Sequence, residues 1–200
     1  MQKLKDEIRN NIIEAAVKEF ARSGYEKTSM RTIARAAGIS VSNTYNYYPN
    51  KEQLFSSIIE PVFNQVKAIF KQSLQQSVGG APGGNNTQSL IDGIVRKLLE
   101  MDDRQRQLLI ILVEKSAGTR YEKSREEMVT LLRMHLAEAV RKPGGASRIT
   151  ENQGYMLNII ATNYVDGIFR ILKDYRDKSW AEENLRILLT YHLNGIKALI

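Results

Sequence analysis

Residues 28–54 read TSMRTIARAAGISVSNTYNYYPNKEQL, and this stretch decides the fold of the N-terminal part of the chain. It contains two short helical patterns separated by a turn at Gly38, since glycine readily adopts the left-handed backbone that such a turn needs. The second pattern is dense in hydroxyl, amide and phenol groups, and Lys51 follows at the start of a further helix. These features are typical of a helix-turn-helix, in which the second helix enters the major groove of DNA.

The apolar residues before and inside this stretch have the spacing of packed helices. A helix that starts near Lys5 carries a stripe at i, i+3, i+4 and i+7, formed by Ile13, Ala16, Val17 and Phe20. We expect Ser23-Gly24 to end this helix. A second helix, with Thr28 as its expected N-cap, carries the same spacing at Met30, Ile33, Ala34 and Ala37.

The third helix is the candidate recognition helix. Ser40 is expected to cap it, and it covers about residues 41–47. Thr44 and Tyr48 lie four residues apart, so we expect both to face inward. The outward residues are then Ser42, Asn43, Tyr45, Asn46 and Tyr47. Hydroxyl and amide groups can bond base edges or phosphates, and Lys51 at a helix start is suited to a phosphate.

The segment from Ile12 to Leu54 also carries the pattern Ile12-x2-Ala15-Ala16-x3-Phe20-x3-Gly24-Tyr25-x2-Thr28-Ser29-Met30-x2-Ile33-Ala34-x2-Ala37-Gly38-Ile39-Ser40-x4-Tyr45-x-Tyr47-Tyr48-x2-Lys51-Glu52-x-Leu54. With this pattern the chain resembles the TetR family of bacterial transcriptional regulators, over about its first quarter and without gaps. The resemblance implies phosphate contacts by Ser29, Tyr45, Tyr47 and Lys51. The resemblance also implies that four residues lie nearest the bases: Arg31, Ser42, Asn43 and Asn46.

Two departures from the family pattern fall in the same segment. Asn43 and Thr44 stand where the family often has a small and an aliphatic residue, and Tyr48 replaces the more usual Phe. The first departure lies on the candidate recognition helix, so we expect it to change which bases the protein prefers. The second is a small change, because both side chains are aromatic.

Composition sets broad limits on the chain. At 42 % hydrophobic and 26 % charged residues it lies in the globular range. The longest apolar run, Leu108 to Val113, is far shorter than the roughly 20 residues of a membrane span, and we expect neither a membrane segment nor a signal peptide. The absence of cysteine excludes disulfides and fits a reducing cytoplasm, where we expect the protein.

The net charge of +7 is spread along the chain. Residues 1–54 hold nine Lys/Arg and six Asp/Glu, a net of +3, and the remainder holds 20 and 16, a net of +4. Charge alone therefore indicates only a mildly basic protein, and the prediction of DNA binding depends on the motif.

The chain as a whole is predicted to be all-α, with about nine helices. We expect a three-helix DNA-binding domain over residues 1–50, with the helix-turn-helix at about 29–48, and a helical domain over 51–200. A helix from about 51 to 77 contains Pro61, which should kink it. Glycine-rich loops are expected around residues 79–86 and 143–145. Helix starts are expected at Thr87 or Ser89, Asp102, Thr119 with Glu122, Thr150 with Gln153, and Ser179 with Glu182.

The last two helices, about 150–176 and 180–200, are apolar on more than one face. One stripe consists of Leu157, Ile160, Ala161, Tyr164, Ile168 and Ile171, and a second of Met156, Ile159, Val165 and Phe169. A helix at the surface of one chain needs only one stripe, so we expect a homodimer built on a four-helix bundle. The alternative is that both helices are buried in their own domain.

The resemblance further implies a small-molecule effector that binds in the C-terminal domain and releases operator DNA. Candidate apolar lining residues are Phe63, Phe70, Met101, Leu109, Leu112, Tyr121, Met128, Leu132 and Met156. Candidate orienting groups are His135, Asn158, Thr162, Asn163 and Asp166. The alternative is a DNA-binding adaptor whose C-terminal domain binds a protein partner.

The sequence gives little support for an enzyme. Its two histidines, His135 and His192, lack metal-ligand spacing, and there is no cysteine nucleophile, G-x-S-x-G or P-loop pattern. We therefore expect no catalytic site, no metal and no cofactor, and a homodimeric repressor of transcription that an effector releases from DNA.

Overall fold

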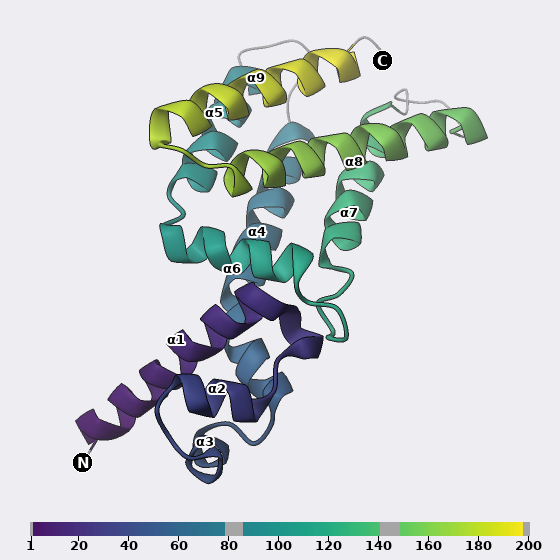
Figure 1. Cartoon of the computed structure of the whole chain (residues 1–200). Helices are drawn as coiled ribbons and strands as arrows, with labels where there is room; N and C mark the ends of the chain where they lie inside the picture. The colour runs from purple at the N-terminus through teal and green to yellow at the C-terminus, as the bar shows by residue number, and fades with distance from the viewer. Residues whose placement is uncertain (1, 79–85, 141–148, 198–200) are drawn as a thin grey trace. The chain divides into compact units, whose positions relative to one another are not determined.

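The structure is a computed structural model, and it describes residues 2–78, 86–140 and 149–197. Within these ranges the regular structure is entirely α-helical, which confirms the predicted all-α fold of about nine helices (Figure 1). The helices are α1 (Gln2–Lys27), α2 (Met30–Ala36), α3 (Val41–Tyr47), α4 (Lys51–Val78), α5 (Asn86–Leu99), α6 (Asp103–Glu114), α7 (Ser124–Val140), α8 (Glu151–Lys173) and α9 (Lys178–Lys197).

The helices group into two compact units. The first unit comprises residues 1–65 and 103–124, and the second comprises 66–102 and 125–200. Helix α4 contributes to both. The predicted division into residues 1–50 and 51–200 is a functional one and stays a prediction.

An aromatic cluster forms the core of the first unit. Phe20 of α1 and Phe55 of α4 are fully buried, and their rings meet edge-on with centroids 4.9 Å apart. Tyr25 meets Phe55 at the same distance, and Tyr121 with Phe63 extends the cluster. Each such pair stabilises the fold by about 0.5–1.5 kcal/mol beyond its buried area. The cluster therefore joins α1 and α4 to the segment after α6.

Helix α1 bends at Gly24, where we expected it to end. Gly24 has φ 77° and ψ 167°, a backbone conformation that is open almost only to glycine. Helical bonding resumes beyond the bend and continues to Lys27. The N–H of Tyr25 donates to the carbonyl of Lys115 at 2.9 Å, so the bent end of α1 is tied to the end of α6.

Two of the predicted helix caps are confirmed. Ser40 caps α3, and Thr150 forms a reciprocal capping box with Gln153 at the start of α8. Both assignments follow from local sequence, because a cap joins groups only two or three residues apart.

Three other caps are wrong. Ser29, rather than Thr28, caps α2 and forms a capping box with Thr32, while the Thr28 hydroxyl donates to Gly24 O. Residues 119–122 form a turn in which the Thr119 hydroxyl donates to Ser116 O, so α7 begins only at Ser124. Asp177 accepts the N–H of Trp180, which makes it the cap of α9 in place of Ser179.

In the second unit, α9 packs against α5 and against α8 (Figure 1). Gly167 of α8 lets α9 approach closely, because a Cβ at this position would lie 2.8 Å from both methyl carbons of Leu188. An ion pair joins α7 to α8, in which Arg125 of α7 donates two hydrogen bonds to Asp166 of α8.

The two predicted glycine-rich loops lie largely or wholly outside the described residues. None of the described helices combines the length and the apolar character that a membrane crossing requires.

Exchanging Gly24 for alanine tests the bend. Gly24→Ala should lower the free energy of unfolding by about 1–3 kcal/mol, because the new Cβ is strained at this backbone conformation. Gly93→Ala is the matched control: Gly93 lies inside α5, and no described atom lies within 4 Å of the added carbon. It should raise stability by about 0.5–1 kcal/mol. Urea denaturation measures both, and equal effects of the two exchanges would contradict a strained bend.

Candidate nucleic-acid interface

The orientation of helix α3 is fixed by groups on its inner side. Thr44 is fully buried, and its hydroxyl donates to Ser40 O at 3.2 Å. Tyr48, directly after the helix, is also buried. The Ser40 hydroxyl accepts the N–H of Asn43 at 3.1 Å and so closes the first turn. The predicted inward positions of Thr44 and Tyr48 are confirmed, and the opposite face of α3 is turned away from the core.

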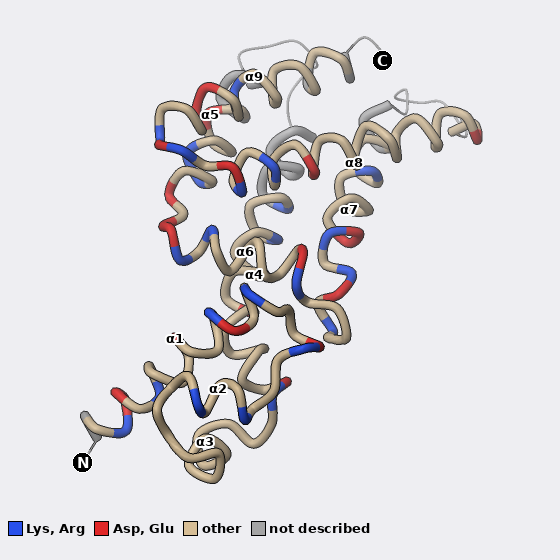
Figure 2. Tube along the Cα trace, viewed as in Figure 1, with Lys and Arg blue, Asp and Glu red and all other residues tan. Residues whose placement is uncertain are grey.

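That outer face carries the predicted contact residues. Tyr45 is 48 % exposed, Ser42 and Asn46 are exposed, and Asn43 and Tyr47 are half-buried. Helix α3 contains no Lys, Arg, Asp or Glu, which Figure 2 shows as an unbroken tan segment. The surface therefore offers hydroxyl and amide groups without a charge of its own. Such groups can bond base edges and phosphate oxygens.

Helix α2, which precedes α3 and packs against it, carries two cations. Arg31 and Arg35 of α2 are both exposed. Ser29 is exposed at the start of α2, but its hydroxyl accepts the N–H of Thr32 at 3.1 Å and already serves as the helix cap. A phosphate contact by Ser29 would have to share this oxygen or use the hydroxyl proton.

Lys51 has internal partners that sequence reasoning missed. Its ammonium group donates to Tyr25 O at 2.7 Å and to Thr28 O at 2.8 Å, and it lies 4.0 Å from the centroid of the Tyr25 ring. Burial lowers the pKa of Lys51, and the carboxylate of Glu26 opposes this shift. No local pattern signals these contacts, because they join residues more than 20 positions apart. The phosphate contact of Lys51 stays a prediction.

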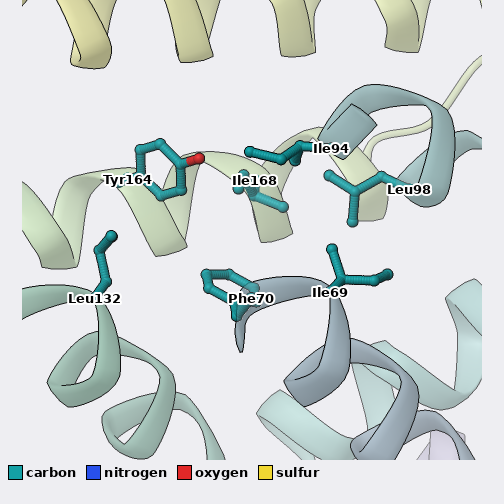
Figure 3. Close-up of a pocket in the computed structure, with 7 residues that line it drawn as sticks. All are labelled: Ile69, Phe70, Ile94, Leu98, Leu132, Tyr164 and Ile168. Atoms are coloured by element: carbon teal, nitrogen blue, oxygen red, sulfur yellow. The ribbon is translucent and has the colours of Figure 1, made fainter. Parts of the chain in front are cut away.

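The second unit contains a small apolar cavity of about 20 Å³. It is lined by residues from four helices: Ile69 and Phe70 of α4, Ile94 and Leu98 of α5, Leu132 of α7, and Tyr164 and Ile168 of α8 (Figure 3). This volume corresponds to roughly one or two water molecules. A larger molecule must therefore displace some of these side chains when it enters.

Tyr164 supplies the polar group of the cavity. In Figure 3 its hydroxyl points across Ile168 toward Ile94. Burial raises the pKa of Tyr164, so that the hydroxyl stays neutral. The Tyr164 ring meets His192 of α9 edge-on at 5.2 Å, and His192 meets Tyr191 in the same way at 5.3 Å.

Of the predicted effector-pocket residues, Phe70 and Leu132 line this cavity. The others lie elsewhere. Phe63, Leu109, Leu112 and Tyr121 belong to the first unit, and Met101 and Met128 are buried in the second. Met156, Asn158 and Asn163 are exposed, and His135, Thr162 and Asp166 are half-buried.

The carboxylate of Asp166 accepts two hydrogen bonds from Arg125, at 2.7 and 2.5 Å, and so has a structural partner. Sequence reasoning missed five lining residues: Ile69, Ile94, Leu98, Tyr164 and Ile168. Their i, i+4 pairs on α5 and α8 were visible in the sequence, but the pattern does not say that the two pairs face each other. The described part of the chain holds no group of three His, Cys, Asp or Glu residues that could bind a metal ion.

Comparison with known proteins finds similar sequences for the segment that carries this interface. Residues 12–58 match the model of the bacterial regulatory proteins of the tetR family. The HTH-type transcriptional regulator YhgD of Bacillus subtilis is 31 % identical over 67 residues, which is 34 % of this chain and 35 % of YhgD. The match thus spans about a third of the length of that relative.

Solved structures show that the likeness of fold extends over nearly the whole chain. NalD, the secondary repressor of the MexAB-OprM multidrug efflux pump in Pseudomonas aeruginosa, matches with a TM-score of 0.58 and 21 % identity, over 96 % of this chain and 97 % of NalD. The structure of a SmeT–triclosan complex matches with a TM-score of 0.58 and 17 % identity, over 94 % of this chain and 90 % of SmeT.

Proposed function

We propose that this chain, whose N-terminal segment is a helix-turn-helix of the tetR family, is a sequence-specific DNA-binding regulator of transcription. The observation that carries the proposal is the burial of Thr44 and Tyr48, which leaves the uncharged polar face of α3 outward. We further propose that it acts in the cytoplasm as a homodimeric repressor. A small-molecule effector then releases it from its operator.

In the proposed complex, α3 lies in the major groove. Ser42, Asn43 and Asn46 bond base edges, while Tyr45 and Tyr47 reach the phosphates. Arg31 of the neighbouring helix α2 neutralises phosphate or bonds a guanine. These roles follow from side-chain chemistry. An amide both donates and accepts hydrogen bonds, as a base edge does, and a tyrosine hydroxyl lies far enough from the main chain to reach a phosphate.

The proposed dimer uses helices α8 and α9. Apolar side chains remain exposed on both: Tyr155 and Met156 on α8, and Ile187 and Tyr191 on α9. Ile187 and Tyr191 lie four residues apart and are 62 % and 73 % exposed, so they share one face of α9. An apolar face of this kind is typical of a dimer interface. A two-fold dimer also presents two copies of α3 to successive major grooves.

The cavity suggests the character of the effector. Its described lining residues are apolar apart from the neutral Tyr164 hydroxyl, and none of them is charged. We therefore propose an uncharged, largely apolar molecule with one hydrogen-bonding group. The triclosan bound to the fold relative SmeT supports an effector of this general kind.

The row of rings from Tyr164 through His192 to Tyr191 suggests how binding is transmitted. It runs from the cavity to an exposed residue on the proposed dimer face. An effector that displaces Tyr164 would shift α9, and a ligand changes DNA affinity only by its preference for one arrangement over the other. Helix α4 offers a second route, because Pro61 removes one backbone hydrogen bond and allows the helix to bend.

An adaptor that binds a protein partner is the second candidate. It is favoured by the small volume of the cavity together with the exposed apolar residues of α8 and α9. A partner protein would then cover these residues in place of a second copy of the chain.

Selection of bound duplexes from a random pool, followed by variants of α3, tests the DNA-binding proposal. Tyr45→Phe should weaken binding about two- to tenfold for every sequence, because a phosphate contact carries no base information. Asn46→Ala should instead relax the preference at one base pair. Met134→Ala, at an exposed position of α7 outside the proposed dimer interface, is the control and should change neither. Failure to enrich any duplex would overturn the proposal.

Placing a charge on α9 tests the dimer. Ile187→Asp should halve the mass measured by light scattering at micromolar concentration, because a carboxylate buried without a partner is costly. Met134→Asp is the matched control, since Met134 is 54 % exposed on α7, outside the proposed interface. A parent protein that is already monomeric would exclude the dimer, and a dimer that survives Ile187→Asp would place its interface elsewhere.

Tyr164→Phe tests the effector site. The free protein should keep its stability within about 1 kcal/mol, because the exchange removes a single oxygen and keeps the ring that packs in the cavity wall. An effector found by screening for release of DNA should bind the variant roughly five- to tenfold more weakly, as measured by calorimetry. Tyr45→Phe, at an exposed position of α3 in the first unit, is the control and should leave effector affinity unchanged. Unaltered affinity of Tyr164→Phe would place the effector away from this cavity.

A further inference from the structure

We propose that Lys5 and Arg9 of α1 form a further contact surface for DNA, which neutralises backbone phosphates beside the outer face of α3. The inference rests on the proposed function, because it extends the same DNA-binding interface. It adds two residues of α1 to an interface proposed so far for α2, α3 and the start of α4. The partner is the DNA backbone, whose phosphates carry no sequence information.

The first turns of α1 lie outside the core of the first unit. The buried part of the helix begins at Ile12, which is fully buried. Of residues 4–11 only Ile8 is half-buried, and all the others are exposed. A segment of this kind buries little apolar surface and so contributes little to the stability of the fold. Its side chains are therefore available to another molecule.

The helix repeat places both cations on the inner face of α1. Lys5 lies seven residues before Ile12, and Arg9 lies seven residues before Ala16, a spacing of about two turns. Ile12 and Ala16 are fully buried in the first unit. Lys5 and Arg9 therefore continue the inner face of α1 beyond the core, on the side where the other helices of this unit pack.

Arg9 lies beside the end of α3. Its guanidinium carbon is 5.9 Å from the centroid of the Tyr48 ring, which is within the range of a cation–π contact. Tyr48 directly follows α3 and is buried. In Figure 1 the N-terminal end of α1 reaches the same edge of the first unit as α3. A duplex that lies along α3 would then pass close to Arg9.

The charges around this surface favour an anionic partner. Among the described residues neither Lys5 nor Arg9 forms an ion pair or donates a side-chain hydrogen bond, so the five N–H donors of Arg9 are available. Asp6 lies about 60° from Arg9 around the helix and partly offsets its charge, whereas Glu7 lies about 160° away. Because α3 has no charged residue, phosphates beside it are neutralised by neighbouring helices.

The experiment measures how salt changes the binding of the full chain to the duplex selected from the random pool. It compares Lys5→Gln and Arg9→Gln with Lys18→Gln, which removes the same charge and is the matched control. Lys18 is exposed on the same helix. It lies two residues after the buried Ala16, about 160° around the helix, and so on the outer face.

Loss of a phosphate contact reduces the slope of log K against log salt by about 0.9 for each bound copy of the chain, or about 1.8 for a dimer. For a dimer, the affinity ratio of parent to Lys5→Gln or Arg9→Gln should then shrink about 12-fold between roughly 50 and 200 mM salt. Lys18→Gln should keep the parent slope. All three variants should keep the parent Tm within about two degrees, because the exchanged side chains are exposed.

Duplexes with single uncharged methylphosphonate groups distinguish a direct contact of Arg9 from mere support of the Tyr48 ring. At one position in each half-site, the neutral group should weaken the parent and cause no further loss in Arg9→Gln, because both changes remove the same contact. If every position weakens the parent and Arg9→Gln equally, Arg9 acts only through Tyr48, and the proposal is wrong.

The same series on a duplex of random sequence, about 30 base pairs long and at low salt, needs no operator, because phosphate contacts supply non-specific binding. A chain without sequence preference would contradict the proposed function, yet smaller slopes for Lys5→Gln and Arg9→Gln on this duplex would still support the α1 surface. Parent slopes for both variants on both duplexes would exclude it. A slope for Lys18→Gln that falls as much as that of Arg9→Gln would exclude it too, since the effect would then be one of net charge.

Discussion

The left-handed bend at Gly24 is the constraint on which the first unit depends. It turns the end of α1 so that Tyr25 enters the aromatic cluster with Phe20 and Phe55, and so that its N–H reaches Lys115. It also presents the carbonyls that accept hydrogen bonds from Lys51. A residue with a Cβ would favour a straight helix or an earlier end at this position, and both alternatives would move the start of α2.

Helix α3 cannot be stable on its own, because seven residues are far below the length at which isolated helices form in water. Its conformation comes from the Ser40 cap, the buried Thr44 and the buried Tyr48. The outer residues Ser42, Tyr45 and Asn46 are exposed, so they can vary with little effect on this packing. This separation explains how one scaffold can present different contact residues without a change of fold.

In the second unit, helix α8 serves two purposes on opposite sides. Tyr164 and Ile168 face the cavity, whereas Tyr155 and Met156 are exposed near its N-terminal end. The excess of apolar residues on this helix, which first indicated a partner chain, is therefore divided between an internal core and an external face. Asp166 of the same helix accepts two hydrogen bonds from Arg125, which tie α8 to α7.

The sequence by itself determined the helical fold, the family resemblance of residues 12–54, the cap at Ser40, the capping box at Thr150 and the inward positions of Thr44 and Tyr48. These features arise from groups within about four residues of each other, where helix periodicity and side-chain chemistry are sufficient. Only the tertiary structure decided the partners of Lys51 and the cavity lined by four helices. Their residues lie tens of positions apart, and the packing of whole helices sets which of several apolar or polar groups meet.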